Sequence, residues 1–483
     1  MSVSYLFLEI AVVLAGLGLL LIDLWTPTVH KRTLGYAAAA VTGVILAFSF
    51  SKIVDPGTPV QAFGGLFVQD GLSLFFKRYF LLAAVLVLLM EVEFSDRIPG
   101  GISEYYALTM FALAGMMTAA SANDFTLLFV SLELMAVTFY VLISFQRSRV
   151  ASLEAGVKYL ILGALSSAIL VYGIALIYGS TGSMNFTTIA AKAAQLKDSR
   201  IAVMGFLFVL VGLGFKVAVV PMQIWVPDVY QGAPTPTSAF LAVGSKAAGF
   251  ALLLRVLHGA APEVALSWER LLMIMSGLTI LYGSLCAIPQ RNLKRLLGYS
   301  SITNAGYLFL GVSAGTMSGA SAVLYYLAGY LFAVVAAFFT ICILSKAHES
   351  EDISELAGLS KRSPLLASVM VLSMVSLAGV PPLAGFFGKF LLLKATAEQA
   401  VSYPLYYVLL SVAVVGIVIS MYYYFGVVRA IFWSRDPQDL SAIPISTPAK
   451  AALWVSVAGM VFLGIFPGWG LRVTDAAAGM LKF

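Results

Sequence analysis

Residues 212–250 have the sequence GLGFKVAVVPMQIWVPDVYQGAPTPTSAFLAVGSKAAGF. The stretch is apolar enough to lie in a bilayer, yet it contains Pro221 and Pro227 and two lysines, Lys216 and Lys246. Proline inside a helix removes a backbone hydrogen bond and clashes with the preceding turn. In hydrocarbon, the freed carbonyl groups are tolerated only where protein or trapped water satisfies them. The stretch therefore predicts a broken membrane helix beside a polar interior.

The composition of the whole chain also indicates a polytopic membrane protein. Of its 483 residues, 60% are hydrophobic and 11% are charged, whereas a soluble domain is typically about 25% charged. Apolar runs long enough to span a bilayer are separated by short polar clusters. These runs lack the apolar–polar alternation of outer-membrane barrels. We therefore expect an all-α integral membrane protein.

The composition argues against several functions. Two cysteines, Cys286 and Cys342, both in apolar stretches, cannot form a zinc or iron–sulfur cluster. Three histidines, His30, His258 and His348, all at the ends of expected spans, argue against haem within the bilayer. The net charge of +6 comes from basic residues that flank helices, which suits membrane anchoring better than nucleic-acid binding. We expect no cofactor or metal in this chain and no nucleic-acid partner.

We expect about fourteen transmembrane helices and no soluble domain. The expected spans lie near residues 3–24, 34–54, 72–90, 104–121, 123–146, 153–179, 200–220 (continuing to about 231), 235–257, 268–288, 296–316, 319–346, 363–397, 404–432 and 448–467. The N-terminal run lacks a basic leader and a cleavage site, so we expect it to be a first span. Lys and Arg number fourteen on one side and ten on the other, which predicts both termini on the outer face.

A second broken helix is expected in the twelfth span. There, Pro381 and Pro382 interrupt the segment SLAGVPPLAGFFGKF, and Lys389 follows them. Prolines often only kink membrane helices, but two breaks at matched positions, each with a lysine, favour function. Paired interrupted helices are the sequence signature of internal repeats around a central ion site.

Five ionisable residues lie within expected spans, where each costs about 2.5–3.5 kcal/mol on insertion scales. They are Glu133, Lys158, Lys216, Lys246 and Lys389. Glu133 has the charge to pair with Lys216 or Lys246, and a static ion pair is the simplest alternative. The deep lysines outnumber the deep carboxylate, however, so they cannot all be neutralised by pairing. Lysines whose charge depends on internal water and on a moving carboxylate favour serial proton transfer.

The stretch at 212–250 resembles the signature of the proton-pumping antiporter-like subunits of respiratory complex I and their Mrp-antiporter relatives. The segments VSLELMAVTFYVL and GVPPLAGFFGKFLLLKA match the same family, and the span count extends the resemblance over essentially the full chain. Four features favour the subunit N branch, the counterpart of mitochondrial subunit 2. They are the length, the absence of a long C-terminal lateral helix, the sequence VPDVYQGAPTP and Lys389.

The resemblance implies two inverted five-helix repeats with discontinuous seventh and twelfth helices. Three N-terminal helices would occupy residues 1–98, the first repeat 99–258, the second repeat 259–435 and a C-terminal helix 436–483. Each repeat would form one half-channel.

The resemblance also implies a role for each deep charge. Glu133 would modulate the charge of Lys216, which would load the proton. Lys246 would pass protons along the central axis, and Lys389 would serve the second half-channel near the exit.

Two further charged residues of this sequence match auxiliary positions of the family. Glu154 and Lys158, which share a helix face, match charged positions of the family. Many relatives have His where this chain has Gln223. Glutamine can hold a water but cannot titrate, which puts a proton relay at that position in doubt.

These observations predict a proton-translocating subunit of a bacterial NADH:quinone oxidoreductase in the inner membrane. NADH, FMN, iron–sulfur clusters and quinone would belong to partner subunits, and sister antiporter-like subunits would pack against this chain. Three alternatives stay open: a subunit of an Mrp-type sodium/proton antiporter, a subunit of a related membrane hydrogenase, and a structural scaffold that does not pump.

Overall fold

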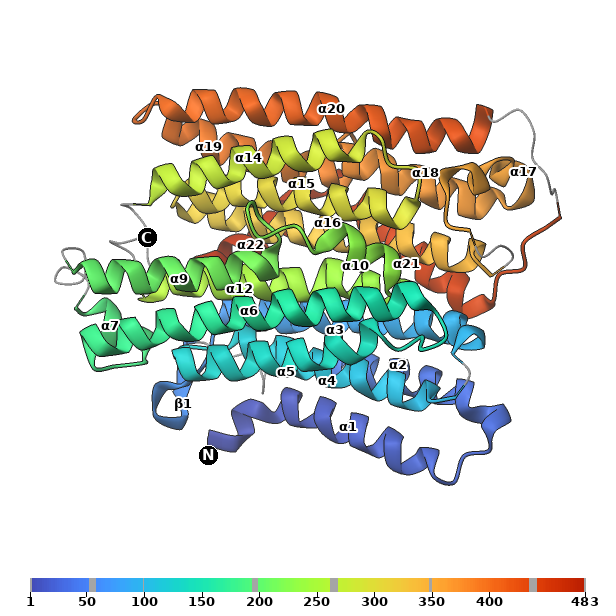
Figure 1. Ribbon diagram of the computed structural model, residues 1–483, viewed down its shortest axis with the longest axis horizontal. Helices are drawn as coiled ribbons and strands as arrows, with labels where there is room; N and C mark the ends of the chain where they lie inside the picture. The colour runs from blue at the N-terminus through green and yellow to red at the C-terminus, as the bar shows by residue number, and fades with distance from the viewer. Residues whose placement is uncertain are drawn as a thin grey trace.

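The computed structural model of the chain is a bundle of long helices that run along one common direction (Figure 1). The structure describes residues 2–51, 58–98, 100–192, 199–260, 268–346, 350–433 and 441–481. Within these ranges, ten helices are long and apolar enough to cross a membrane. The chain is therefore an all-helical, multi-span membrane protein. Its two short strands, β1 (Val60–Ala62) and β2 (Phe67–Gln69), pair as an antiparallel hairpin.

The helices occupy the chain in two groups. The first group is α1 (Phe7–Asp23), α2 (Lys31–Phe48), α3 (Gly71–Phe94), α4 (Ile102–Ala120), α5 (Phe125–Ile143), α6 (Val150–Thr181), α7 (Phe186–Ala190), α9 (Arg200–Val217), α10 (Val226–Gly232), α11 (Thr235–Phe240) and α12 (Lys246–Arg255). The second group is α14 (Glu269–Ala287), α15 (Leu293–Ser313), α16 (Met317–Leu344), α17 (Leu359–Arg362), α18 (Pro364–Ala378), α19 (Ala384–Ala400), α20 (Leu405–Trp433), α21 (Thr447–Ile465) and α22 (Pro467–Ala478). Two π-helical segments, Leu241–Ser245 and Val256–Ala260, flank α12.

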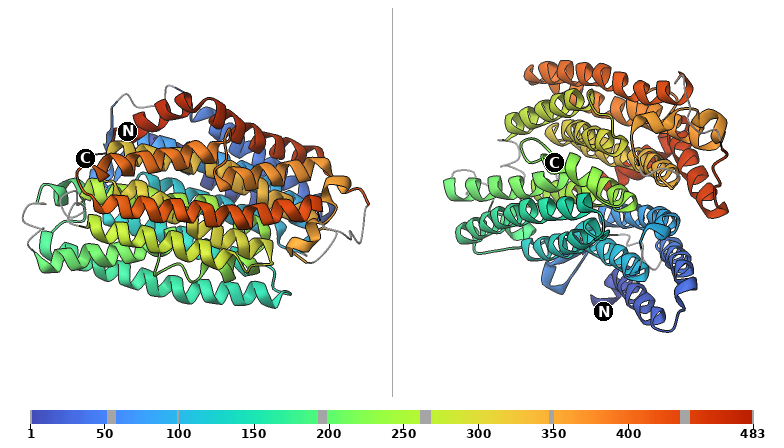
Figure 2. Two further views of the ribbon diagram at one scale, coloured as in Figure 1. Left: turned by 90° about the horizontal axis from the view of Figure 1, so that it is seen from above. Right: turned by 45° about the vertical axis from the view of Figure 1, so that its right-hand side comes forward.

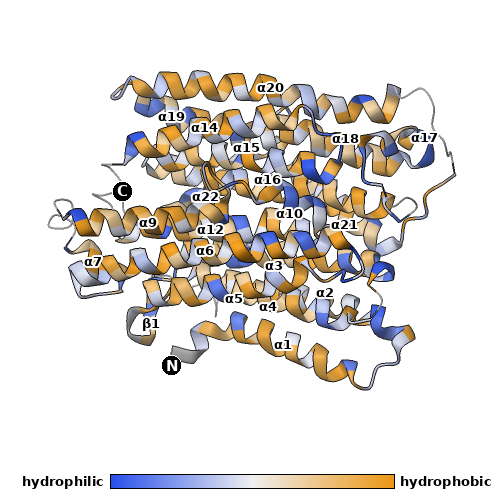
Figure 3. Ribbon diagram, viewed as in Figure 1, coloured by the Kyte–Doolittle hydropathy of each residue, from blue (hydrophilic) through white to orange (hydrophobic). Residues whose placement is uncertain are grey.

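The two groups lie as adjacent halves of the bundle. In Figures 1 and 2, the N-terminal helices lie at one edge and α18 to α20 at the other. The stretch Thr235–Ala260 and α16 lie between them, and they are the most buried of the ten spans. The outer helices consist mostly of hydrophobic residues along their length, while hydrophilic residues gather near the ends and around α10 (Figure 3). An apolar outer face and a partly polar interior fit a helical bundle in lipid.

Local sequence explains where helices start and how closely they pack. Asp70 caps α3 by accepting a hydrogen bond from the backbone N–H of Ser73 at 2.8 Å, and the Ser73 hydroxyl accepts one from the Asp70 N–H in return. Helices α6 and α9 approach each other at Gly173 and Gly205. A Cβ atom at Gly173 would lie 2.6 Å from the Gly205 carbonyl oxygen, so small residues set this distance.

Several observed elements differ from the expected spans. The expected twelfth span is two helices, α18 and α19, and the expected eighth span is divided into α11, a π-helical turn and α12. The sequence did not predict α22, whose short amphipathic pattern is weaker than that of a span. Parts of the expected second span and His348 lie outside the described residues.

Candidate functional site

The first helix break begins directly after Lys216. Helix α9 ends at Val217, and the next residue, Ala218, has the left-handed φ of 63°. Pro221 lies in the irregular segment that follows. At the break, the carbonyl oxygen of Phe215 accepts hydrogen bonds from the Ala218 N–H at 3.3 Å and from Trp225 Nε1 at 3.0 Å, which satisfies the backbone in a water-poor environment.

Pro227 does not break a helix. It stands in the first turn of α10, where a proline has no hydrogen bond to lose and its fixed φ suits the helix. Gln223 lies between α9 and α10 and is buried. The interruption of the seventh span therefore covers the residues between α9 and α10, with Pro221 inside it and Pro227 beyond it.

Lys216 is buried, with 4% of its surface exposed. Its Nζ lies 5.8 Å from the ring centre of Tyr159 and 5.7 Å from that of Phe215. Among the described residues, no hydrogen-bond acceptor contacts this Nζ. A buried ammonium without a protein acceptor needs water to solvate its charged form, so its charge depends on what surrounds it.

Glu133 does not form the direct ion pair that its charge suggested. Its carboxylate accepts a hydrogen bond from Ser167 on α6 at 2.5 Å. Within the described ranges, neither Lys216 nor Lys246 lies within 4.0 Å of it. Glu133 and Lys216 both face α6, where they contact Ser167 and Tyr159, respectively. Among the described residues, the Glu133 carboxylate therefore has a neutral hydroxyl as its partner and no fixed cation.

Lys246 is the first residue of α12 and follows a π-helical turn. Such turns occur frequently at functional sites because they reorient a side chain. Lys246 is buried, and its Nζ donates hydrogen bonds to the carbonyl oxygen of Ser301 at 2.6 Å and to the Ser301 hydroxyl. Gly249 brings α12 close to α9, because a Cβ atom there would lie 3.2 Å from Cβ of Lys216.

At the second helix break, Lys389 donates hydrogen bonds to the carboxyl end of the preceding helix. Helix α18 ends at Ala378, and Gly379 has a φ of 86°; Pro381 and Pro382 follow before α19 begins. Lys389 Nζ donates to the carbonyl oxygens of Leu377 at 2.7 Å and of Ala378 at 3.2 Å. A cation at the carboxyl end of a helix is favoured by unpaired carbonyl groups and by the helix dipole.

Polar side chains lie between Lys246 and Lys389. Tyr326 donates to Asn304 Oδ1 at 2.6 Å, and the Asn304 amide donates to Ser300 Oγ at 3.4 Å. Ser300 precedes Ser301, the partner of Lys246. At the other end, Tyr326 packs against Gly388, where a Cβ atom would lie 2.4 Å from its ring. We call Ser300, Ser301, Asn304 and Tyr326 the polar chain.

Two further hydroxyl groups join the polar chain. The Tyr424 hydroxyl and Ser300 Oγ lie 2.5 Å apart, and the Tyr230 hydroxyl lies 3.2 Å from Ser301 Oγ. Tyr424 belongs to a run of three tyrosines whose sequence suggests ordinary packing. The polar chain thus contains hydroxyl and amide groups that can both donate and accept hydrogen bonds.

Partly exposed charges form ion pairs at the first turn of α10. Lys158 pairs with Glu154 and with Asp228, both at 2.7 Å, and Asp228 also pairs with Arg295 at 2.6 Å. The Lys158 side chain is 41% exposed, so this group of charges lies at the outside of the bundle and not in its core. The sequence did not single out Asp228, although it immediately follows Pro227 in the interrupted segment.

A family model described as NADH:quinone oxidoreductase/Mrp antiporter, transmembrane, matches residues 122–420. The chain belongs to this family. A protein of Heliobacterium modesticaldum named NADH-quinone oxidoreductase subunit N is 41% identical and covers 99% of each chain. Another with the same name, from Rhodospirillum rubrum, is 39% identical over 98% of this chain and 96% of its own.

Solved structures show the same antiporter-like fold. A chain in the structure of respiratory complex I from Thermus thermophilus with bound aureothin has a TM-score of 0.80 and 32% identity, covering 97% of this chain and 99% of its own. A chain of the Mrp complex from Dietzia sp. has a TM-score of 0.86 and 22% identity, covering 100% and 98%. At 22% identity, the likeness shows the fold alone.

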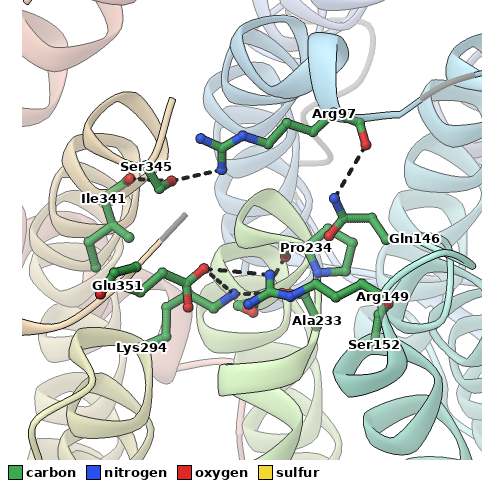
Figure 4. Close-up of polar contacts among 12 residues, drawn as sticks. Arg97, Gln146, Arg149, Ser152, Ala233, Pro234, Lys294, Ile341, Ser345 and Glu351 are labelled. Atoms are coloured by element: carbon green, nitrogen blue, oxygen red, sulfur yellow. Dashed lines mark hydrogen bonds and ion pairs between the residues drawn. The ribbon is translucent and has the colours of Figure 1, made fainter. Parts of the chain in front are cut away.

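This member of the antiporter family also has a buried cluster that the sequence did not reveal (Figure 4). Lys294 Nζ lies 3.0 Å from the Glu351 carboxylate and donates to the Ala233 carbonyl oxygen at 2.7 Å. Arg149 lies 3.8 Å from the same carboxylate. Ala233 joins α10 to α11, so Lys294 ties the second group of helices to the interrupted segment of the first.

Two more buried ion pairs lie among the N-terminal helices. Lys77 pairs with Glu9 at 2.8 Å, and Arg255 pairs with Asp70 at 2.8 Å. Glu9 seemed close enough to a span end to reach the surface, yet it is buried. In the described part of the chain, no group of three or more His, Cys, Asp or Glu could hold a metal ion.

Proposed function

We propose that this chain is the N-type antiporter-like subunit of a bacterial proton-translocating NADH:quinone oxidoreductase in the inner membrane. Relatives of that name are about 40% identical over nearly their full length, which supports this choice over an Mrp antiporter or a membrane hydrogenase. The subunit would have about fourteen transmembrane helices and both termini on the outer face.

We infer that two inverted five-helix repeats, 99–258 and 259–435, form its half-channels. Helices within 1–98 and 436–483 would flank them. NADH, FMN, iron–sulfur clusters and quinone would be bound by partner subunits, with no redox centre in this chain. Sister antiporter-like subunits would contact its outer faces.

The observation that carries the proposal is the linear order of buried groups. Lys216 and Lys389 each stand at a helix break, and Lys246 and the polar chain lie between them. Buried lysines are costly in a membrane, and a scaffold could achieve the same packing with apolar residues. Hydrogen-bonded groups that both donate and accept protons suit a transfer path.

The proposed transfer begins with the Glu133 carboxylate. When Glu133 leaves Ser167 and approaches Lys216, the charged form of Lys216 is stabilised and a proton is taken up. When Glu133 returns to Ser167, this stabilisation is lost and the proton moves to Lys246. From Lys246 it would follow the polar chain to Lys389, near the exit.

Quinone reduction in partner subunits would drive the cycle. Charge displaced there would change the position of Glu133 relative to Lys216. The energy reaches this chain as an electric field and not as a bound substrate. Glu154 and Lys158 would act as auxiliary charges at the end of α10, and Gln223 would hold water without titrating.

The test is Lys216→Met in the assembled complex, with Lys394→Met as the control. Lys394 is 60% exposed and has a weak pair with Glu398. We expect Lys216→Met to lose most NADH:quinone reductase activity and proton pumping together, while the control keeps both. Normal pumping in Lys216→Met would support a scaffold, and pumping that depends on sodium would support an antiporter.

A further inference from the structure

An apolar cavity of about 830 Å³ lies between the N-terminal helices and the C-terminal end of the chain. It is lined by the end of α2, the first half of α3, part of α16, and α21 with α22. This volume lies in the range of about 300–1,000 Å³ that is usual for small-molecule sites. The cavity shares none of the residues of the proposed proton path.

The cavity begins at the membrane surface and extends inward. Helices α3 and α16 both begin beside α22, because Gly71 approaches Met480 and Met317 approaches Gly479. On α3 the lining runs from Gly71 to Leu82, about 16 Å along the helix. This depth exceeds half of the roughly 30 Å hydrocarbon core, so the cavity crosses one leaflet and suits an acyl chain.

The cavity is open at the outer surface of the bundle. Phe50, Phe462, Trp469, Val473 and Met480 line it and are large apolar residues with exposed surface. On a soluble protein such residues would indicate a docking site for another protein. In a bilayer, an outward-facing apolar cavity that no partner subunit covers is open to the acyl chains of lipids.

Two arginines lie on the wall of this apolar cavity, Arg78 and Arg472. The Arg78 guanidinium stacks 4.5 Å above the ring of Phe50 and donates to the Ser49 carbonyl oxygen at 2.8 Å, which fixes its position. Arg472 is exposed on α22 and donates to the Gly468 carbonyl oxygen at 3.3 Å. Asp70 also lines the cavity, but Arg255 neutralises its charge.

Helix α22 runs antiparallel beside the first half of α16, because Tyr325 approaches Gly470, Ser321 lies 2.9 Å from Thr474, and Met317 approaches Gly479. Trp469, Arg472, Val473 and Ala476 recur at helical spacing on its cavity side. Tryptophan and arginine are typical of the headgroup region. Arg78 and Arg472 each lie about 10 Å along the bundle from the first residue of α3 and of α16, respectively, which places both near the level of lipid phosphates.

We propose that this cavity binds an anionic phospholipid. Its acyl chain lies between α3 and α16, and its phosphate lies between Arg78 and Arg472. Guanidinium groups bind phosphate by charge and by paired hydrogen bonds. A neutral quinone would fill the same apolar space but would gain nothing from two cations. The bound lipid joins the N-terminal helices to α22.

The test uses the assembled complex in detergent with photoactivatable phosphatidylglycerol or phosphatidylcholine, followed by mass spectrometry of the labelled peptides. We expect phosphatidylglycerol to label α3 and α22 more strongly. Arg472→Gln should lower this labelling about fivefold, as loss of one basic residue at an anionic surface predicts. Arg200→Gln, an exposed arginine that does not line the cavity, should leave it unchanged.

A second variant separates the cavity from general surface charge. Ala476→Phe would fill the cavity without removing an arginine, and we expect it to lower labelling by both lipids. Equal labelling by both lipids that Arg472→Gln does not change would overturn the proposal. So would displacement by a quinone analogue, or no labelling of these peptides in the assembled complex.

Discussion

At the scale of single residues, Lys216 and Lys389 occupy their helix breaks differently. Lys389 donates to two carbonyl oxygens at the end of α18, so the backbone itself stabilises its charge. Lys216 has no such acceptor among the described residues, and the nearby carboxylate, Glu133, is held by Ser167. The charge of Lys216 should therefore respond most strongly to a movement of Glu133.

A substitution at Gly379 tests how tightly the second helix break positions Lys389. Gly379→Ala would place a Cβ atom 2.9 Å from Cδ of Lys389 at a left-handed φ of 86°. We expect a backbone cost of about 1–2 kcal/mol and, in addition, a loss of coupled activity because Lys389 must move. Heat stability of the complex and the NADH:quinone reductase rate measure the two effects.

Gly315→Ala is the matched control for this prediction. Gly315 also has a left-handed φ, of 61°, but has open space where the new methyl group would lie. It should show the backbone cost alone and keep full activity. Equal activity of the two variants would mean that the position of Lys389 does not matter.

At the scale of elements, the two helix breaks could be predicted from the sequence and the polar chain could not. Proline acts on its own helix, so Pro221, Pro381 and Pro382 mark the interruptions directly. Pro227 was misleading because proline also occurs in the first turn of helices, as it does in α10. Ser300, Asn304 and Tyr326 look like ordinary residues of apolar helices, and only the packing of α15 against α16 brings them together.

Tyr326→Phe tests whether the polar chain conducts protons. It removes the hydroxyl that donates to Asn304, and we expect proton pumping to fall several-fold. The control is Tyr325→Phe on the same helix, because the Tyr325 hydroxyl is equally buried but donates to the Leu463 carbonyl oxygen instead. Each variant should lose about 1 kcal/mol of stability. A similar effect of both on pumping would contradict the proposed role.

At the scale of the whole molecule, buried ion pairs connect segments that are distant in sequence. Arg255 joins Asp70 from 185 positions away and also donates to the Ala120 carbonyl oxygen. Lys294 and Glu351 connect to the interrupted segment at Ala233. Without a structure, the sequence could not pair these residues, because charges near span ends suit membrane anchoring equally well.

Asp70→Asn should strongly impair assembly. It leaves Arg255 buried without its anionic partner, which typically costs about 3–5 kcal/mol, while Asn can still cap α3. The amount of assembled complex and its heat stability provide the measurement. Glu398→Gln, which removes an exposed pair, should cost less than about 1 kcal/mol. Adding Arg255→Gln to Asp70→Asn should restore part of the loss, and no restoration would argue against the ion pair as the cause.

The central claim is that Lys246 joins the two helix breaks into one proton path. The most direct measurement is proton pumping and NADH:quinone reductase activity of Lys246→Met in an intact complex. We predict that both fall together, because the hydrogen bonds from Lys246 to Ser301 are the connection to the polar chain. Normal pumping at a normal reductase rate would contradict the account.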